Sequence, residues 1–216
     1  MTSAFNKQVL LKAAVYSTSG QVRQYIPSLV PAAMLMTYIS PTSLHKIGKV
    51  LTDWWKSDKT SVENVTEYIL MKENSSETVT DRHNTMKEKV RDVLSIDVNL
   101  SEPLGTGCDV THFDIITSSL CLEAAAQTLD QYRSNAANVS SLLKSGGHLI
   151  LNGVLGQSWY RVGEAKFACV SLTREDIESI FVSCGFDIVS METVMSQEGG
   201  YYSDFQGYFI MHANKN

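Results

Sequence analysis

The residues best suited to chemistry in this chain come directly after runs of apolar residues that are typical of buried strands. Asp97 and Glu123 supply carboxylates at such positions, and Tyr160 supplies an aromatic hydroxyl. A carboxylate there can hold a cationic or polar group. In parallel α/β sheets, ligands bind outside the carboxyl ends of the strands. The turns to consider are Tyr16 to Gly20, Tyr38 to Ser43, Asp97-Val98, Ser118 to Glu123, and Asn152 to Tyr160.

The four cysteines form no metal or redox motif. They lie far apart, with no C-x-x-C pair and no histidine nearby at ligand spacing: Cys108, Cys121, Cys169 and Cys184. This excludes zinc-ribbon, thioredoxin-like and disulfide-framework proteins. We therefore expect free thiols and no metal.

Composition predicts an ordinary globular protein. The 216 residues include 18 Lys and Arg against 23 Asp and Glu, a net charge of −5. This length fits a single domain over residues 1–216, and the charge argues against nucleic acid or an acidic membrane as a partner. The longest apolar stretch, Val30 to Met36, is far shorter than the roughly 20 residues of a membrane-spanning helix. With no signal-like N-terminus, we expect a cytoplasmic monomer.

In the first half of the chain, the sequence pattern of the strands and helices that would position these residues is less regular. Val9 to Val15 and Ala33 to Tyr38 read as short strands, and a helix from Pro41 to Trp54 follows the N-cap Ser40. The polar stretch Asn74 to Asn84 is typical of a loop, and Met86 to Val93 of a short charged helix.

The second half alternates strands and helices more clearly. Strands are predicted over Phe113 to Ser118, His148 to Val154, Phe186 to Val194 and Gly207 to Ala213. Apolar residues at helical spacing predict one long helix from Ala125 to Leu143, and a capping box at Thr173 opens another that Gly185 ends. This order predicts an α/β fold, a mostly parallel sheet with an antiparallel edge strand.

Several segments from Met86 to Ile188, roughly half the chain, resemble the small-molecule N-methyltransferases that act on nicotinamide, indolethylamine and phenylethanolamine. In order, they are Leu94-Ser-Ile-Asp-Val98, Glu102-Pro-Leu-Gly105, Ser118-Ser-Leu-Cys-Leu-Glu-Ala-Ala125, Ser141 to Ile150 and Tyr160 to Phe167. The resemblance implies a Rossmann-like sheet that binds S-adenosylmethionine. It also implies methyl transfer to an unprotonated nitrogen of a small amine or N-heterocycle, a reaction that depends on positioning and exclusion of water.

The resemblance also assigns cofactor-binding residues. Asp97 and Val98 match the pair at the adenine, although Asp97 is also explained as an ordinary cap at a strand end. Ser119 matches a cofactor contact after a strand, with a plain helix-start turn as its alternative. Gly20, Tyr38 and Ser43 lie in the turns that match the family's cofactor loops.

On the substrate side, the resemblance assigns Leu120, Glu123, Trp159 and Tyr160, with Glu123 and Tyr160 as the catalytic candidates. Glu123 would face the nitrogen-bearing end of the substrate. As alternatives, an acid in the first turn of a helix favours the helix dipole, and Tyr160 can serve packing alone.

The first half departs from the family pattern. The glycine-rich turn becomes Tyr16 to Gly20, Tyr38 stands where an acid grips the ribose, and the second acid of the substrate side falls at Gly153. We also expect the N-terminal helical lid to be absent. A non-catalytic, degenerate family member acting as a binding or regulatory domain is therefore the alternative function. A dehydrogenase is disfavoured, because no G-x-G-x-x-G motif follows a strand.

Overall fold

The computed structural model describes residues 10–11, 63–89, 94, 96–106, 112–196 and 200–216. The chain divides into two compact units, residues 1–11 with 96–216 and residues 12–95. The single domain therefore stays a prediction. Several predictions concern residues outside the described ranges: the helix over 41–54, the strand over 33–38, most of the strand over 9–15, the absence of a lid, and the roles of Gly20, Tyr38 and Ser43.

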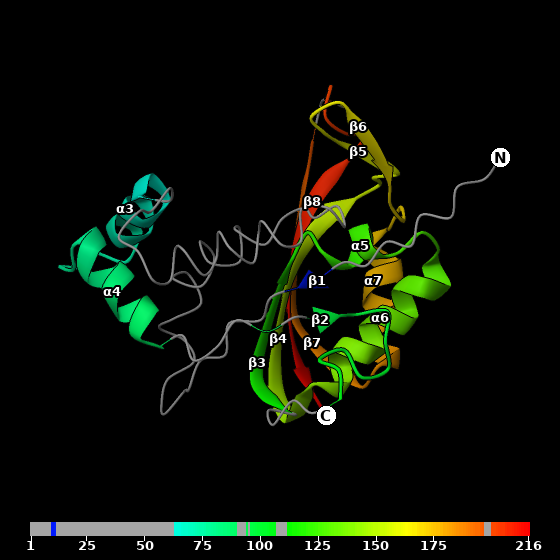
Figure 1. Cartoon of the computed structure of the whole chain (residues 1–216), viewed down its shortest axis with the longest axis horizontal. Coiled ribbons are helices and arrows are strands. Elements are labelled where there is room, and N and C mark those ends of the chain that lie inside the picture. Colours follow the sequence, from blue (N-terminus) through cyan, green and yellow to red (C-terminus); the bar gives the residue numbers. More distant parts are fainter. Residues whose placement is uncertain (1–9, 12–62, 90–93, 95, 107–111, 197–199) are drawn as a thin grey trace. The chain divides into compact units, whose positions relative to one another are not determined.

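Within its described residues, the larger unit is built on a four-stranded sheet (Figure 1). The order is β3 (Phe113–Ser119), β4 (Leu143–Leu155), β8 (Gly207–Lys215) and β7 (Phe186–Met195). β3 and β4 are parallel, and β8 is antiparallel to both of its neighbours, so three of the four strands run in one direction. This confirms the α/β class and the mostly parallel sheet.

The position of the antiparallel strand differs from the expectation. β8 lies between β4 and β7 and not at the edge. The physical reason is that β7 runs parallel to β4 one strand further out, and the chain then turns back into the gap. There β8 forms hydrogen bonds on both sides, and β7 is left as the outer strand of the described sheet.

Three helices, α5 (Leu122–Ala125), α6 (Leu129–Ser141) and α7 (Arg174–Ser183), lie on one side of the sheet (Figure 1). Alternate side chains of the central strands point to this side and are fully buried, including Leu149, Leu151, Met211 and Ala213. From the helices, Tyr132 and Phe181 complete the core with an edge-to-face contact at 6.5 Å between ring centroids.

The single helix predicted over Ala125 to Leu143 is wrong. α5 ends in an extended Ala126, and α6 begins after Thr128, whose hydroxyl accepts a hydrogen bond from the Gln131 backbone N–H. This cap starts a new helix with its own direction. By contrast, the capping box at Thr173 is confirmed: its hydroxyl and the Asp176 carboxylate bond each other's backbone N–H groups, and Gly185 follows α7 with φ of +84°.

A short hairpin between β4 and α7 was not predicted. It consists of β5 (Trp159–Val162) and β6 (Ala165–Ala168), joined by a turn in which Gly163 has φ of +55°. A second small pairing joins β1 (Leu10–Leu11) to β2 (Ile96–Asp97) in antiparallel register.

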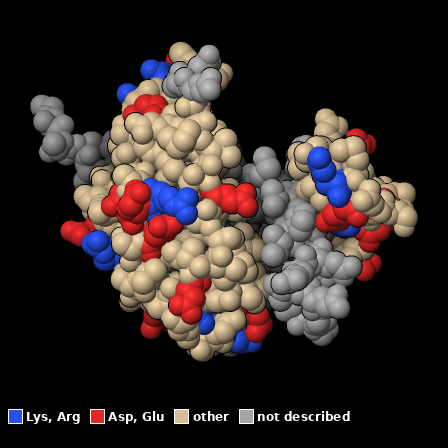
Figure 2. Space-filling view, turned by 180° about the vertical axis from the view of Figure 1, so that it is seen from behind, with Lys and Arg blue, Asp and Glu red and all other residues tan. Residues whose placement is uncertain are grey.

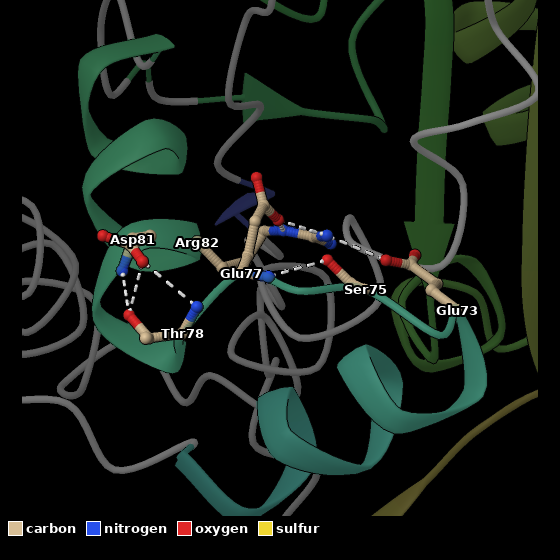
Figure 3. A network of polar contacts seen from close by, with 6 residues as sticks. All are labelled: Glu73, Ser75, Glu77, Thr78, Asp81 and Arg82. Carbon is tan, nitrogen blue, oxygen red and sulfur yellow. Dashed lines mark hydrogen bonds and ion pairs between the residues drawn. The ribbon is translucent and has the colours of Figure 1, made fainter.

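The smaller unit is described over α3 (Glu63–Lys72) and α4 (Val79–Lys89). The loop predicted over Asn74 to Asn84 is therefore largely wrong, because α4 begins inside it. Thr78 and Asp81 form a reciprocal cap, and Arg82 donates to Glu73 and Glu77 across the turn (Figure 3). Local capping thus forms a helix where hydrophobic periodicity is weak.

The described residues include no helix that is both long and apolar enough to cross a membrane. On the face of the larger unit shown in Figure 2, basic and acidic side chains lie among one another. That face therefore presents no extended area of a single charge.

Candidate active site

The carboxyl end of β3 is the centre of the candidate site. Leu120, directly after the strand, has φ of +51°, an uncommon conformation for a residue with a side chain. Its N–H donates to the backbone oxygen of Asn152 on β4, and the Asn152 side chain donates to Ser119 Oγ at 3.0 Å. Strained backbone held by surrounding contacts is frequent at functional sites.

Glu123 lies on α5, one turn further along the chain, and is only 2% exposed. Its Oε1 accepts a hydrogen bond from the Val154 backbone N–H at 3.3 Å, whereas its Oε2 is buried with no hydrogen-bond partner. Burial raises the pKa of Glu123 to about 7, and the hydrogen bonds from backbone N–H groups offset only part of this effect. A carboxyl group with such a pKa can exchange a proton near neutral pH.

Gly153 makes room for this carboxylate. A Cβ atom placed on Gly153 would lie 2.6 Å from Glu123 Oε1 and 2.8 Å from Phe209 Cε1. Both separations are shorter than van der Waals contact. In the family pattern, position 153 carries a second acid. In this chain it is a glycine, and the Glu123 carboxylate occupies the space beside it.

We expect Gly153→Ala to lower the free energy of unfolding by about 1–3 kcal/mol, because the added methyl group overpacks the space next to Glu123. Denaturant unfolding monitored by circular dichroism measures this change. Gly200→Ala is the matched control, since the nearest atom to a Cβ there is 3.9 Å away. Equal stability of the two variants would contradict the tight packing at Gly153.

Asp97 is the last residue of β2, and Val98 begins the turn that follows, which is hydrogen-bonded to α6. Asp97 Oδ1 accepts two hydrogen bonds from Asn99, through its backbone N–H and its Nδ2, and among the described residues Oδ2 accepts none. Gln131 and Asn138 of α6 donate to Asn99 Oδ1 and to the Val98 backbone oxygen. Asp97 therefore caps its own turn and still has one oxygen for a further donor.

Val98 differs from Asp97 in accessibility. Its side chain is fully buried, whereas Asp97 is partly exposed. Contact of Val98 with a bound ring therefore requires its neighbours to move. Ser119 is also buried, and its hydroxyl already accepts the bond from Asn152.

Trp159 and Tyr160 are consecutive residues of β5, so their side chains point to opposite faces of the hairpin. The Lys166 ammonium lies 4.0 Å from the centroid of the Trp159 ring, and the Tyr160 ring stacks on Phe167 with centroids 5.5 Å apart. Each aromatic ring thus has one face covered by its own hairpin. The two residues cannot line one pocket from the same face.

Two features of the site had no signal in the residue pattern. The Ser118 hydroxyl is buried next to Ser119 without a hydrogen-bond partner. Asp204 accepts hydrogen bonds from the backbone N–H groups of Ser158 and Trp159, which anchors the start of β5. Desolvation opposes ionisation of Asp204, but the hydrogen bonds from Ser158 and Trp159 outweigh it and lower its pKa. The contacts of Asp204 join residues that are 45 and 46 positions apart in the chain.

Comparison with known proteins decides the family. The family model described as NNMT/PNMT/TEMT matches residues 43–216, which is most of the chain. The chain belongs to the NNMT/PNMT/TEMT family. Phenylethanolamine N-methyltransferase of Macaca mulatta is 31% identical over 154 residues, covering 69% of this chain and 54% of that protein. Nicotinamide N-methyltransferase of Homo sapiens is 29% identical over 184 residues, covering 84% and 68%.

Among solved structures, a S-adenosylmethionine-dependent methyltransferase from Methanosarcina mazei is similar, with a TM-score of 0.47 at 12% identity, covering 77% of this chain and 86% of that one. The resemblance to the small-molecule N-methyltransferases that was predicted from the sequence is confirmed. This family member spans about half the length of the Macaca mulatta relative it matches. The monomeric state and the cytoplasmic location stay predictions.

Proposed function

We propose that this chain binds S-adenosylmethionine and transfers its methyl group to the nitrogen of a small amine or N-heterocycle. The single observation that carries the proposal is Glu123, which is fully buried at the carboxyl end of β3 with an unpartnered Oε2. A buried acceptor without a partner costs free energy in the absence of a ligand. Glu123 lies at the edge where α/β sheets bind ligands, so a substrate N–H group can donate a hydrogen bond to the unpartnered Oε2.

Two of the described residues support the proposed cofactor site. Asp97 Oδ2 is available to accept a bond from an exocyclic amine, and Leu120 brings strained backbone close to the end of β3. When bound, S-adenosylmethionine supplies an electrophilic methyl group for direct displacement. Asp97 and Ser119 are the described residues that would hold it.

Glu123 is the group that would act on the substrate. As a carboxylate, its Oε2 accepts the N–H of a cationic amine and removes the proton that blocks the nitrogen lone pair. Val154 holds the other oxygen and so fixes the orientation of the carboxyl group. Leu120 and Tyr160 would exclude water around the nitrogen, which strengthens the interaction with Glu123.

A non-catalytic binding domain is the second candidate, and specific contacts favour it. Val98 is fully buried, Ser119 Oγ is engaged by Asn152, and one face each of Trp159 and Tyr160 is covered by Lys166 and Phe167. A site whose groups are already satisfied by the protein has fewer contacts left for a ligand.

Calorimetric titration with S-adenosylmethionine and S-adenosylhomocysteine tests the proposal first. Saturable binding of one molecule per chain, followed by stoichiometric release of S-adenosylhomocysteine with an amine or N-heterocycle, supports the transferase. Binding with no turnover across both substrate classes favours the non-catalytic domain. A folded sample that binds neither compound at millimolar concentration refutes the cofactor site.

Asp97→Ala is expected to weaken binding of S-adenosylhomocysteine about 10- to 100-fold, because a hydrogen bond to a charged acceptor contributes about 1.5–3 kcal/mol. The same calorimetric titration measures the loss. Asp130→Ala is the matched control, since the Asp130 side chain on α6 is 93% exposed. Unchanged affinity in Asp97→Ala would leave Asp97 with only its capping role toward Asn99.

A further inference from the structure

Two histidines lie side by side on the face of the sheet opposite α6 and α7. His148 belongs to β4 and His212 to β8. They alternate along their strands with the buried residues Leu149 and Met211, and therefore point to the other face. His148 pairs with Asn214, and His212 with Ile150, so the two rings are diagonal neighbours on adjacent strands. Both histidines are partly exposed.

The two rings present nitrogens to each other. His148 Nδ1 and His212 Nε2 are 3.1 Å apart, and the ring planes are tilted by 35°. A metal ion bound by two imidazoles at about 2.0–2.1 Å, with bond angles between square-planar and tetrahedral values, places its nitrogens roughly 2.9–3.4 Å apart. The two histidines therefore already have the separation that chelation requires, on a rigid antiparallel pair.

A third donor lies in the same row of the sheet. Asn214, the direct partner of His148, has a buried Oδ1 with no hydrogen-bond partner. Amide oxygens are acceptable ligands for divalent ions. The described residues hold no group of three or more His, Cys, Asp and Glu side chains at metal-binding distance. The ion would thus take two imidazoles, this amide oxygen and water.

We infer that His148, His212 and Asn214 form a site for a late first-row divalent metal ion such as Zn²⁺. Each histidine binds as a neutral imidazole, and the ion replaces the N–H···N hydrogen bond between the rings. The proton of that bond moves to the far nitrogen of the same ring, so no net proton is released. The bound ion would tie β4 to β8.

Titration of the tag-free chain with Zn²⁺ tests this site independently of any enzymatic activity. Calorimetry should show one ion per chain with micromolar affinity, and Zn²⁺ should raise the unfolding temperature, because the ion binds only the folded sheet. His148→Gln and His212→Gln should each weaken binding at least 10-fold. His112→Gln, an exposed histidine outside the sheet, should bind as the parent does.

The Asn214→Asp variant distinguishes a metal site from two histidines that are neighbours without binding metal. A carboxylate in place of the amide adds a negative ligand, so the affinity for Zn²⁺ should rise at least several-fold. Co²⁺ bound at the site should show visible absorption bands that the His148→Gln variant lacks, a readout that holds even if His212→Gln does not fold. Absence of saturable binding at 100 μM Zn²⁺ (about 100 times a micromolar Kd), or equal binding by the parent and both glutamine variants, would overturn the site.

Discussion

Glu123→Gln is expected to lower the turnover of a cationic amine by about 10²–10⁴-fold, the usual contribution of a positioned general base. Glutamine keeps the shape of the side chain and its acceptor for the Val154 N–H, but it cannot remove a proton. Affinity for S-adenosylhomocysteine should change little, because Glu123 acts on the substrate side. Steady-state assays of S-adenosylhomocysteine release, together with calorimetry, measure both quantities.

The same substitution should change how stability depends on pH. The folded-state pKa of Glu123 is about 7 and its ordinary value is 4.5, so the folded chain binds more protons than the unfolded chain between these values. The free energy of unfolding therefore falls as pH rises from about 4.5 through 7, by roughly 3 kcal/mol for this group. Glu123→Gln should lack this part of the fall.

Glu164→Gln is the matched control for both measurements, since Glu164 is exposed in the turn of the hairpin. It should retain parental turnover and parental pH dependence of unfolding. If Glu123→Gln keeps the parental turnover of amines, Glu123 is confined to a structural role at the start of α5. If turnover falls but the pH dependence of stability is unchanged, the carboxylate is ionised well below pH 7.

Phe181→Ala should lower the free energy of unfolding of the larger unit by about 3–5 kcal/mol. The Phe181 ring is fully buried and makes edge-to-face contacts with Tyr132 on α6 and Phe186 on β7, at 6.5 and 5.7 Å between centroids. Its removal leaves a cavity where α6, α7 and the sheet meet. Urea unfolding followed by circular dichroism measures the loss.

The neighbouring residue Val182 provides the control for this measurement. Its side chain is 58% exposed on the same helix, so Val182→Ala should change stability by less than about 0.5 kcal/mol. A similar loss of stability in both variants would mean that the contribution of α7 does not depend specifically on the aromatic core. In that case the packing between α6 and α7 would not be the main support of the sheet.

The second half of the fold was predictable because its signals are local. Phe113 to Ser118 and Phe186 to Val194 are rich in β-branched and other apolar residues that favour strands, and their observed bounds agree within a residue. Thr173 and Gly185 mark the ends of α7 through their own side chain and backbone. Short-range rules suffice for such elements.

The predictions of secondary structure were wrong where a local sequence pattern was compatible with two structures. The spacing from Ala125 to Leu143 fits one helix, but the Thr128 cap breaks it, and Leu143 already belongs to β4. The polar stretch around Thr78 lacks a hydrophobic face, yet its capping box and the Arg82 contacts to Glu73 and Glu77 form a helix. Capping hydrogen bonds outweighed periodicity in both places.

The sequence by itself determined the family, the α/β class and the identity of the candidate residues, because motif order and strand pattern are properties of neighbouring residues. Only the tertiary structure decided the state of each candidate. It buries Glu123 beside Gly153, directs Trp159 and Tyr160 to opposite faces, and brings His148 to within 3.1 Å of His212. Burial, strand register and distance arise from residues far apart in the chain, and desolvation then sets the pKa of Glu123.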